Sequence, residues 1–320
     1  MLTRRHVLLA SVAAGVAMNS RAAFSKAAQP ATPVNFDMPA GACDCHTHIH
    51  ADPETFPFFA GRVYTPELAS PEEMSALHKA LHIERVVIVT PSVYGPDNRA
   101  TQFGMQARGA NARGVAVIDD KTSEADLDAM QKAGFRGIRL NLATGGVSDP
   151  NVGKARFSAA VDRMKARGWH VQLYTTLPMI TAIKELVLAS PVPAVFDHFG
   201  GADAALGVGQ PGFSDLVDLV KSGKAYVKIS GAYRSSKLAP DYSDVVPLAK
   251  ALIEANPDRI VWGTDWPHPN SVTGKPITEV TPLFQIDDGR LLNQLPVWAP
   301  DAAVRKTILV DNPARLYGFG

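Results

Sequence analysis

The stretch Asp44-Cys45-His46-Thr47-His48-Ile49-His50 decides how the fold of this chain is interpreted. We expect residues 42–49 to form a strand, and side chains alternate between the two faces of a strand. Asp44, His46 and His48 are therefore predicted to share one face. Two adjacent imidazoles at a strand end bind a metal, polarise a carbonyl group or move protons. The alternative is a pair of histidines that only packs, but few folds need such a pair for stability.

The first residues are typical of an exported protein. Arg4 and Arg5 precede an apolar run at residues 7–18, which is shorter than the roughly 20 residues that a membrane-spanning helix needs. Residues 1–28 are therefore predicted to be a cleaved export signal. The paired arginines resemble a twin-arginine signal, which exports folded proteins, and the alternative is a signal for the general secretory route. We expect a periplasmic protein without stable membrane association.

Acidic and basic residues are nearly balanced over the whole chain. The 320 residues include 32 Lys or Arg and 31 Asp or Glu, which gives a formal net charge of +1. This balance argues against a nucleic-acid partner. The two cysteines, Cys43 and Cys45, lie too close in one strand to form a disulfide framework. We predict that both are small buried residues on the face opposite His46 and His48.

Eight short apolar runs rich in β-branched residues recur along the chain. They are predicted to be strands at residues 42–49, 85–92, 114–118, 135–141, 169–175, 194–200, 225–231 and 259–265. Helices are expected between them, for example at residues 123–133, 155–167 and 242–255, and Ser70-Pro71-Glu72-Glu73 is a good helix start. Eight strands alternating with helices predict one α/β domain over residues 41–320, a single (β/α)8 TIM barrel.

In a barrel of this kind the active site forms where the strands end and the next loops begin. Polar side chains occupy nearly every such position of this chain. They are His46, His48, Ser92, Arg139, Asn141, Tyr174, His198, Ser230, Arg234 and Asp265. A polar ring above an apolar barrel is difficult to explain by structural needs, so it predicts an active site.

The His-x-His pair, the late histidine and the aspartate that ends the eighth strand resemble the amidohydrolase superfamily. The sequences Trp262-Gly-Thr-Asp-Trp-Pro-His268 and Asp311-Asn-Pro-Ala-Arg-Leu-Tyr-Gly318 are similar to one branch of it. That branch contains 2-pyrone-4,6-dicarboxylate lactonase, 4-sulfomuconolactone hydrolase and sugar-acid lactone isomerases. The resemblance covers essentially the whole mature chain. It implies a barrel of the amidohydrolase type and a hydrolase that opens a lactone ring carrying a carboxylate or sulfonate.

The resemblance also implies roles for single residues. Asp265 is expected to activate water, and His46, His48 and His198 are expected to polarise the lactone carbonyl. The residues expected to hold the acidic groups of the substrate are Tyr64, Ser92, Arg139, Tyr174 and Arg234. The pyrone dicarboxylate lactonases of this branch have a second arginine shortly after the fourth strand, whereas residues 142–148 of this chain contain none. A substrate with one fewer, or a differently placed, anionic group is therefore expected.

The physical requirements of lactone hydrolysis agree with this set of residues. The reaction needs a base near a water molecule and hydrogen-bond donors at the oxygen that becomes negative. A carboxylate with clustered imidazoles supplies both. The planar guanidinium of arginine suits the oxygens of a carboxylate or sulfonate.

No metal is expected in the site. Zinc hydrolases of the superfamily usually add a histidine or a modified lysine from the fourth or fifth strand, where this chain has Arg139 and Tyr174. An arginine near the site also repels a dication. The alternative is one zinc ion, which four residues could hold. They are His46, His48, His198 and Asp265.

Several other interpretations stay open. They are a lactone isomerase acting on a sugar-acid lactone, a zinc-dependent decarboxylase or hydrolase of the same superfamily, and an exported non-catalytic binder of organic acids. Binding alone needs no base, so Asp265 argues against the binder. The alternative role of Arg139 and Arg234 is a structural ion pair. We interpret His170 and His268 as structural residues. The expected ligand is a small lactone carboxylate, and a homo-oligomer is an open alternative.

Overall fold

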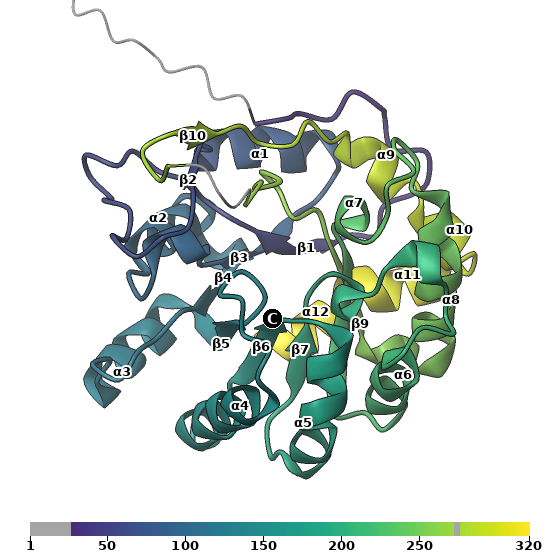
Figure 1. Cartoon of the computed structure of the whole chain (residues 1–320). Helices are drawn as coiled ribbons and strands as arrows, with labels where there is room; N and C mark the ends of the chain where they lie inside the picture. The colour runs from purple at the N-terminus through teal and green to yellow at the C-terminus, as the bar shows by residue number, and fades with distance from the viewer. Residues whose placement is uncertain (1–26, 272–275) are drawn as a thin grey trace, which may run out of the picture.

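The computed structural model of the chain describes residues 27–271 and 276–320, so nearly all of the predicted export signal lies outside the described residues. Eight parallel strands form one sheet in the order β1-β3-β4-β5-β6-β7-β8-β9. A parallel bridge from Thr47 to Trp266 joins the two ends of this sheet. Figure 1 shows the helices arranged around the strands. The prediction of a (β/α)8 TIM barrel is confirmed.

All eight predicted strands are present, several of them shorter than expected. They are β1 (Cys43–Thr47), β3 (Arg85–Val89), β4 (Ala112–Ala116), β5 (Phe135–Asn141), β6 (His170–Tyr174), β7 (Ala194–Phe196), β8 (Ala225–Ser230) and β9 (Ile260–Gly263). β3 and β7 end early because short 3-10 helices, η1 (Ser92–Tyr94) and η3 (His198–Gly201), begin where the predicted strands continue. A small parallel pair, β2 (Thr65–Pro66) and β10 (Val280–Thr281), is not predicted. Two residues per strand are too few to give a periodic pattern.

Helices follow the strands around the barrel. They are α1 (Pro71–Ala80), α2 (Arg99–Arg108), α3 (Glu124–Ala133), α4 (Pro150–Met164), α5 (Leu177–Ala189), α6 (Phe213–Lys221), α7 (Ala232–Ser235), α8 (Val246–Ala255), α9 (Asp288–Leu292), α10 (Leu295–Trp298), α11 (Ala302–Lys306) and α12 (Asn312–Tyr317). The predicted start of α1 is confirmed: the Ser70 hydroxyl accepts from the Glu73 N–H, and the Glu73 carboxylate accepts from the Ser70 N–H. Among the described residues, no helix is long and apolar enough to cross a bilayer.

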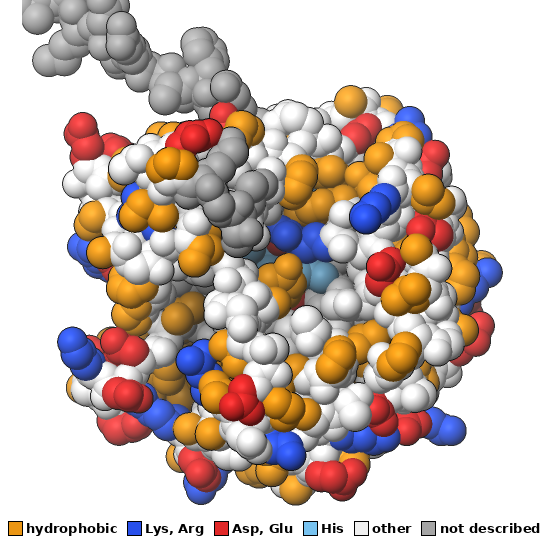
Figure 2. All heavy atoms as spheres, in the orientation of Figure 1, with side chains coloured by type: hydrophobic (Ala, Val, Ile, Leu, Met, Phe, Trp, Pro, Cys, Tyr) orange, Lys and Arg blue, Asp and Glu red, His pale blue; other side chains and the backbone are white. Residues whose placement is uncertain are grey.

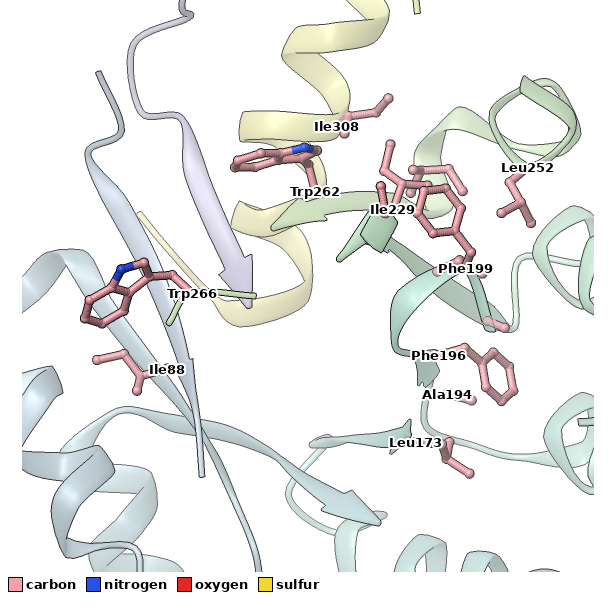
Figure 3. Close-up of a cluster of buried hydrophobic side chains, with 14 of the residues drawn as sticks. Ile88, Leu173, Ala194, Phe196, Phe199, Ile229, Leu252, Trp262, Trp266 and Ile308 are labelled. Carbon is pink, nitrogen blue, oxygen red and sulfur yellow. The ribbon is translucent and has the colours of Figure 1, made fainter. Parts of the chain in front are cut away.

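The strands separate two apolar regions. Val86 and Ile88 belong to the outer core, which Figure 3 shows in part, whereas Val87 and Val89 belong to a second cluster. Because successive side chains point to opposite faces, this second cluster fills the inside of the barrel. We call it the inner cluster. Its buried members are Cys43, Cys45, Val87, Val89, Val115, Val195, Tyr226, Val261, Tyr317 and Phe319.

The first strand corrects one prediction. The pairing of β1 with β3 shifts between Asp44 and Thr47. Such an irregularity turns the side chains that follow it to the other face. Cys45 belongs to the inner cluster, and the ring of His46 also lies inside the barrel, beside the interior of β8. The prediction that Asp44 shares a face with His46, opposite the cysteines, is therefore wrong. Both cysteines are free and buried, as predicted.

Candidate active site

A pocket at the carboxyl ends of the strands collects eight of the nine predicted site residues. It has a volume of about 30 Å³. The predicted residues in its lining are His48, Tyr64, Ser92, Arg139, Tyr174, His198, Arg234 and Asp265. Figure 2 shows a hollow near the middle of this face with Lys or Arg and His side chains inside it. The ninth residue, His46, is fully buried and lies behind the lining.

A larger cavity of about 510 Å³ adjoins this pocket. The two share Ser92, Arg139 and Asn141 in their linings. The larger cavity extends past Ile138 on β5 toward Arg156 on α4.

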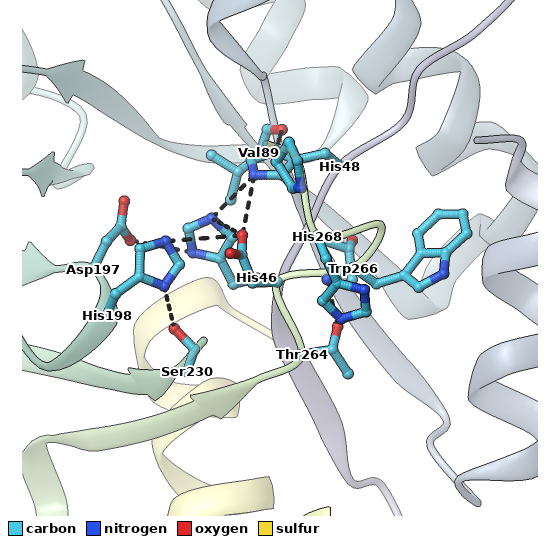
Figure 4. Close-up of polar contacts among 12 residues, drawn as sticks. His46, His48, Val89, Asp197, His198, Ser230, Thr264, Trp266 and His268 are labelled. Atoms are coloured by element: carbon cyan, nitrogen blue, oxygen red, sulfur yellow. Dashed lines mark hydrogen bonds and ion pairs between the residues drawn. The ribbon is translucent and has the colours of Figure 1, made fainter. Parts of the chain in front are cut away.

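Three imidazoles surround one carboxylate oxygen, and Figure 4 shows how the rings of His46, His48 and His198 lie relative to one another. Asp265 Oδ1 lies 3.6 Å from Nε2 of His46, 3.5 Å from Nε2 of His48 and 3.8 Å from Nε2 of His198. The Nε2 atoms of His46 and His48 are 3.3 Å apart. Oδ1 is buried and has no hydrogen-bond partner among the described residues. The sequence predicts all four residues of this cluster, and the structure brings them together.

Asp44 fixes the backbone of this cluster at the junction of β1 and β9. Its Oδ1 accepts from the N–H groups of His46 (3.1 Å) and Thr264 (3.0 Å), and its Oδ2 accepts from the Thr264 hydroxyl. The N–H of Asp265 donates to the carbonyl of His46 at 2.8 Å. Asp265 has φ of 66°, a left-handed conformation that a non-glycine residue keeps only with such support.

The second oxygen of Asp265 is held by two donors. Oδ2 accepts from Arg234 Nε at 2.5 Å and from the Tyr233 hydroxyl at 2.6 Å. Burial opposes ionisation of Asp265, but Arg234 and His198 outweigh it and hold the pKa of the carboxyl well below its usual value. Asp265 is therefore ionised near neutral pH. Tyr233 is a site residue that the sequence reasoning missed, although it stands next to a predicted arginine.

The histidines of the cluster are neutral near pH 7. Burial lowers the pKa of His198 to about 4, although Asp265 opposes this change. Burial also lowers the pKa of His46 and of His48. Each ring therefore carries one proton, and its hydrogen bonds decide which nitrogen holds it. His198 Nδ1 lies 3.0 Å from the Ser230 hydroxyl, an arrangement visible in Figure 4.

A buried polar network below the pocket was also missed from the sequence. Asp197 Oδ2 accepts from Arg139 Nε and from Gln172 Nε2, each at 3.1 Å. Lys228 Nζ donates to Gln172 Oε1 at 2.8 Å and lies 3.5 Å from Asp197 Oδ1. The network could have been suspected from polar residues that interrupt apolar strands, such as Gln172 and Lys228 in His170-Val-Gln172 and Tyr226-Val-Lys228. Arg139 thus has an internal ion pair, and no group among the described residues accepts from its terminal nitrogens.

The two histidines interpreted as structural lie outside the pocket lining. His170 is buried, and its ring makes an edge contact with Tyr317. His268 Nε2 lies 3.0 Å from Asp288 Oδ1, and both side chains are fully buried. The ring of His268 also packs against Tyr233.

The cluster fits a tetrahedral dication geometrically. Ligand atoms about 2.0–2.1 Å from a zinc ion lie about 3.3 Å from one another. The atoms of His46, His48 and Asp265 come close to this spacing, and a second group consists of His46, Asp197 and His198. Cations oppose it: Arg234 ion-pairs with Asp265, and Lys228 contacts His46. The distances between the possible ligand atoms are thus compatible with a bound zinc ion, whereas the positive charges of Arg234 and Lys228 beside them oppose it.

Known proteins with similar sequences share this architecture. The chain matches the family described as Amidohydrolase over residues 43–319. It is 36% identical over 291 residues to 4-sulfomuconolactone hydrolase of Hydrogenophaga intermedia, which covers 89% of this chain and 91% of that protein. It is 35% identical to 2-pyrone-4,6-dicarboxylate hydrolase of Comamonas testosteroni, with 91% and 94% covered.

Two further relatives widen the comparison. D-galactarolactone isomerase of Agrobacterium fabrum is 31% identical, with 89% of this chain and 94% of that protein covered. A solved structure from Agrobacterium tumefaciens superimposes with a TM-score of 0.75 at 28% identity, covering 90% of this chain and 99% of that one. The match of the family over nearly all described residues, together with these relatives, confirms the predicted relationship: the chain belongs to the amidohydrolase family.

Proposed function

We propose that this protein is a hydrolase that opens a lactone ring carrying a carboxylate or sulfonate. The observation that carries the proposal is the ionised Asp265, which lines a pocket together with arginine and histidine side chains and has one oxygen, Oδ1, without a hydrogen-bond partner among the described residues. A base next to a site for an anion is what hydrolysis of an acidic lactone needs. The named activities of the relatives support the same substrate class.

Arg139 is the anchor for the acidic group in this proposal. Its Nε is held by Asp197, so the guanidinium is fixed in place while its terminal nitrogens have no partner among the described residues. Tyr174 packs against the guanidinium, with its ring centroid 5.4 Å from Arg139 Cζ. A guanidinium held in this way binds a carboxylate or sulfonate with little loss of side-chain freedom. Residues 142–148 add no second arginine, so the panel of test substrates should include lactones with a single acidic group.

Asp265 is the general base in this proposal. The oxygen of a water molecule bonds to the lactone carbonyl carbon as Oδ1 accepts the proton of that water. The carbon–oxygen bond of the ring then breaks, and the proton passes to the departing ring oxygen. The product is the ring-opened acid, and water is the only co-reactant.

His198 is the donor for the oxygen that becomes negative. If the Ser230 hydroxyl donates to Nδ1, the ring proton of His198 is on Nε2, and His198 is one of the residues that line the pocket. The sequence reasoning gave this role to all three histidines. His46 is fully buried, however, and Nδ1 of His48 lies 2.7 Å from the Val89 carbonyl, which fixes its single proton there. We therefore assign His46 and His48 to the support of Asp265.

We propose that the metal-free form carries this activity. If zinc is bound, His46, His48, His198 and Asp265 would hold it, and the ion would polarise the carbonyl or lower the pKa of a water molecule. The cations around the cluster favour the metal-free form. Activity that survives chelation, with zinc well below one equivalent, is the expected result. Loss on chelation and recovery with zinc would contradict it.

Mass spectrometry of the products tests the reaction. The purified protein is incubated with lactones that carry one carboxylate, two carboxylates, a sulfonate or sugar hydroxyls. Hydrolysis adds the mass of one water, whereas isomerisation leaves the mass unchanged. The isomerase alternative is kept because the A. fabrum relative is named as one. Absence of turnover with every lactone, together with stoichiometric binding, would instead identify a binder of organic acids.

We also propose that the protein acts in the periplasm. Arg4 and Arg5 precede the short apolar run, and these residues lie outside the described part of the chain. Replacement of both arginines by lysine should retain the precursor in the cytoplasm if the twin-arginine route is used. Unchanged export of this variant would indicate the general secretory route.

A further inference from the structure

Lys228 is a buried cation to which the proposed reaction gives no role. Its side chain is completely buried inside the barrel on β8. Nζ donates to Gln172 Oε1, lies 3.5 Å from Asp197 Oδ1 and is 3.3 Å from Nδ1 of His46. A buried ammonium group costs several kcal/mol unless it is paired, so its place behind a histidine of the cluster requires an explanation.

The neighbouring histidine shows what this contact does. Nδ1 of His48 lies 2.7 Å from the Val89 carbonyl, which only accepts hydrogen bonds, so the proton of neutral His48 is on Nδ1. Nε2 of His48 is then an acceptor. It lies 3.3 Å from Nε2 of His46, and a hydrogen bond between them requires the proton of His46 to be on Nε2.

Lys228 completes this chain of hydrogen bonds. With its proton on Nε2, His46 has an acceptor at Nδ1. Lys228 Nζ is the donor in contact with that atom among the described residues, and an ammonium group cannot accept. The hydrogen bonds therefore run from Lys228 through His46 to His48 and the Val89 carbonyl. In this arrangement His46 Nε2–H also faces the unpartnered Oδ1 of Asp265, 3.6 Å away.

The other tautomer of His46 has a competing partner. Asp197 Oδ1 lies 3.2 Å from Nδ1 of His46 and would accept its proton. Bare lone pairs of His46 Nε2 and His48 Nε2 would then face each other and the oxygen of Asp265. That arrangement is unfavourable by itself, and a dication would stabilise it because all three atoms become ligands.

We propose that Lys228 is a positioning residue that keeps the proton of His46 on Nε2 and thereby favours the metal-free site over a metal-binding one. The tautomer is argued from the contacts of neutral His46, in which the hydrogen bond to His48 is set against the competing acceptor Asp197 Oδ1, and only its importance for catalysis rests on the proposed function. Lys228 thus acts on the site through His46 and has no contact with the pocket.

The test replaces Lys228 by methionine, which has similar length and no donor. Arg139 stays to neutralise Asp197 in this variant. Nitrogen-15 NMR of the histidine rings, recorded after chelation, reports the tautomer directly. Wild-type His46 should be protonated on Nε2, and Lys228→Met should move the proton to Nδ1. Zinc binding, measured by calorimetry, should become at least about tenfold tighter in Lys228→Met.

Two further variants keep the test decisive. Tyr226 lies two residues before Lys228 on β8 and belongs to the inner cluster. The control Tyr226→Phe removes a hydroxyl that Arg259 contacts, and it should leave the tautomer of His46 and the zinc affinity unchanged. Lys228→Gln retains a hydrogen-bond donor and is used if Lys228→Met does not fold. It should keep a larger fraction of His46 protonated on Nε2 than Lys228→Met does. If His46 of wild type carries its proton on Nδ1, or if neither Lys228 variant changes tautomer or zinc affinity, the proposal is wrong. Absence of lactone turnover in wild type would overturn the proposed function and leave these readouts unaffected.

Discussion

The two ends of the barrel interior are built on the same strands and have opposite chemistry. Near the amino ends, Cys43, Val87 and Val261 pack with Tyr317 and Phe319 from the C-terminal segment. Near the carboxyl ends, the same interior holds charged groups in hydrogen-bond contact. They are Arg139, Asp197, Lys228, Arg234 and Asp265. The difference shows that a few residues along each strand separate the part that stabilises the fold from the part that performs chemistry.

The two ends also satisfy their buried groups differently. The lower end is stabilised mainly by close packing, because its members are mostly apolar, although the buried hydroxyl of Tyr317 has no hydrogen-bond partner among the described residues. At the upper end the charged side chains are paired, but two buried carboxylate oxygens, Asp265 Oδ1 and Asp197 Oδ1, have no hydrogen-bond partner among the described residues. A buried polar atom without a partner is expensive in folding free energy and is expected where substrate or water binds. Substitutions at the two ends should therefore affect different measured quantities.

The largest expected effect is that of Asp265→Asn at the upper end. Asparagine tolerates the left-handed backbone of this position but cannot accept a proton from water. We expect kcat to fall by about 10²–10⁴ while substrate still binds and the thermal unfolding midpoint changes little. Steady-state kinetics and circular dichroism measure both. Turnover like that of wild type in a folded variant would remove Asp265 as the base.

Tyr317→Ala is the matching change at the lower end. Tyr317 is fully buried in the inner cluster and packs against His170. Its loss should lower the free energy of unfolding by about 3–5 kcal/mol, as for other large aromatic residues truncated in a core. Urea unfolding measures this change, and kcat of the remaining folded protein should stay near that of wild type. A large loss of kcat without loss of stability would mean that the two ends are not separable.

The two arginines of the upper end should differ from each other. Arg139→Met removes the proposed anchor and should raise KM by about 10–100-fold with kcat nearly unchanged, because a charge-assisted hydrogen bond contributes about 1.5–3 kcal/mol. Arg234→Met also releases Oδ2 of Asp265, so kcat should fall as well. Kinetics on the two variants measures both parameters. Equal effects of the two substitutions on KM alone would show that the ion pair to Asp265 has no part in the chemistry.

The smallest effect concerns acid stability and His170. Burial lowers the pKa of His170 to about 3, against about 6.5 in an unfolded chain. When the pH is above the pKa of the unfolded chain, the His170 ring is neutral in both the folded and the unfolded state. When the pH falls below that pKa, the ring binds a proton in the unfolded state but not in the folded state. Stability is therefore lost as pH falls, with a slope of about 1.4 kcal/mol per pH unit from this residue between about pH 6 and pH 4. His170→Phe should reduce the slope by that amount in urea unfolding at several pH values. Parallel curves for the two proteins would contradict the assignment.

The fold was predictable because the pattern of an apolar strand followed by a helix is repeated along the chain. Eight apolar runs separated by helical segments leave few alternatives, and the rule that barrel sites form at the strand ends places His48, His198 and Asp265 together. All five residues expected to hold the substrate line one pocket in the structure. Their roles stay predictions until they are measured.

The features that could not be predicted from the sequence depend on the three-dimensional geometry of the strands. The shift in pairing after Asp44 involves no special residue, so strict alternation placed Asp44 beside His46 incorrectly. The contact of Lys228 with His46 joins residues 182 positions apart in the chain. Strand alternation puts Lys228 inside the barrel, but the height and tilt of neighbouring strands decide which side chain it meets.

The bond between Asp44 and Thr264 has a consequence for how activity arises during synthesis. It joins the first barrel strand to the end of the last one, and the reactive cluster is built across that junction. A growing chain that has not yet emerged past residue 265 has its histidines but lacks their carboxylate, whatever else has folded. Under the proposed mechanism, catalytic competence is thus gained late in synthesis, and activity would report a completed ring rather than a partly folded one. The native chain order places its two ends on either side of this junction. A circular permutant opened on the opposite side of the ring would carry Asp44 and Asp265 in the middle of its chain, so we expect its cluster to form before the last strands have emerged.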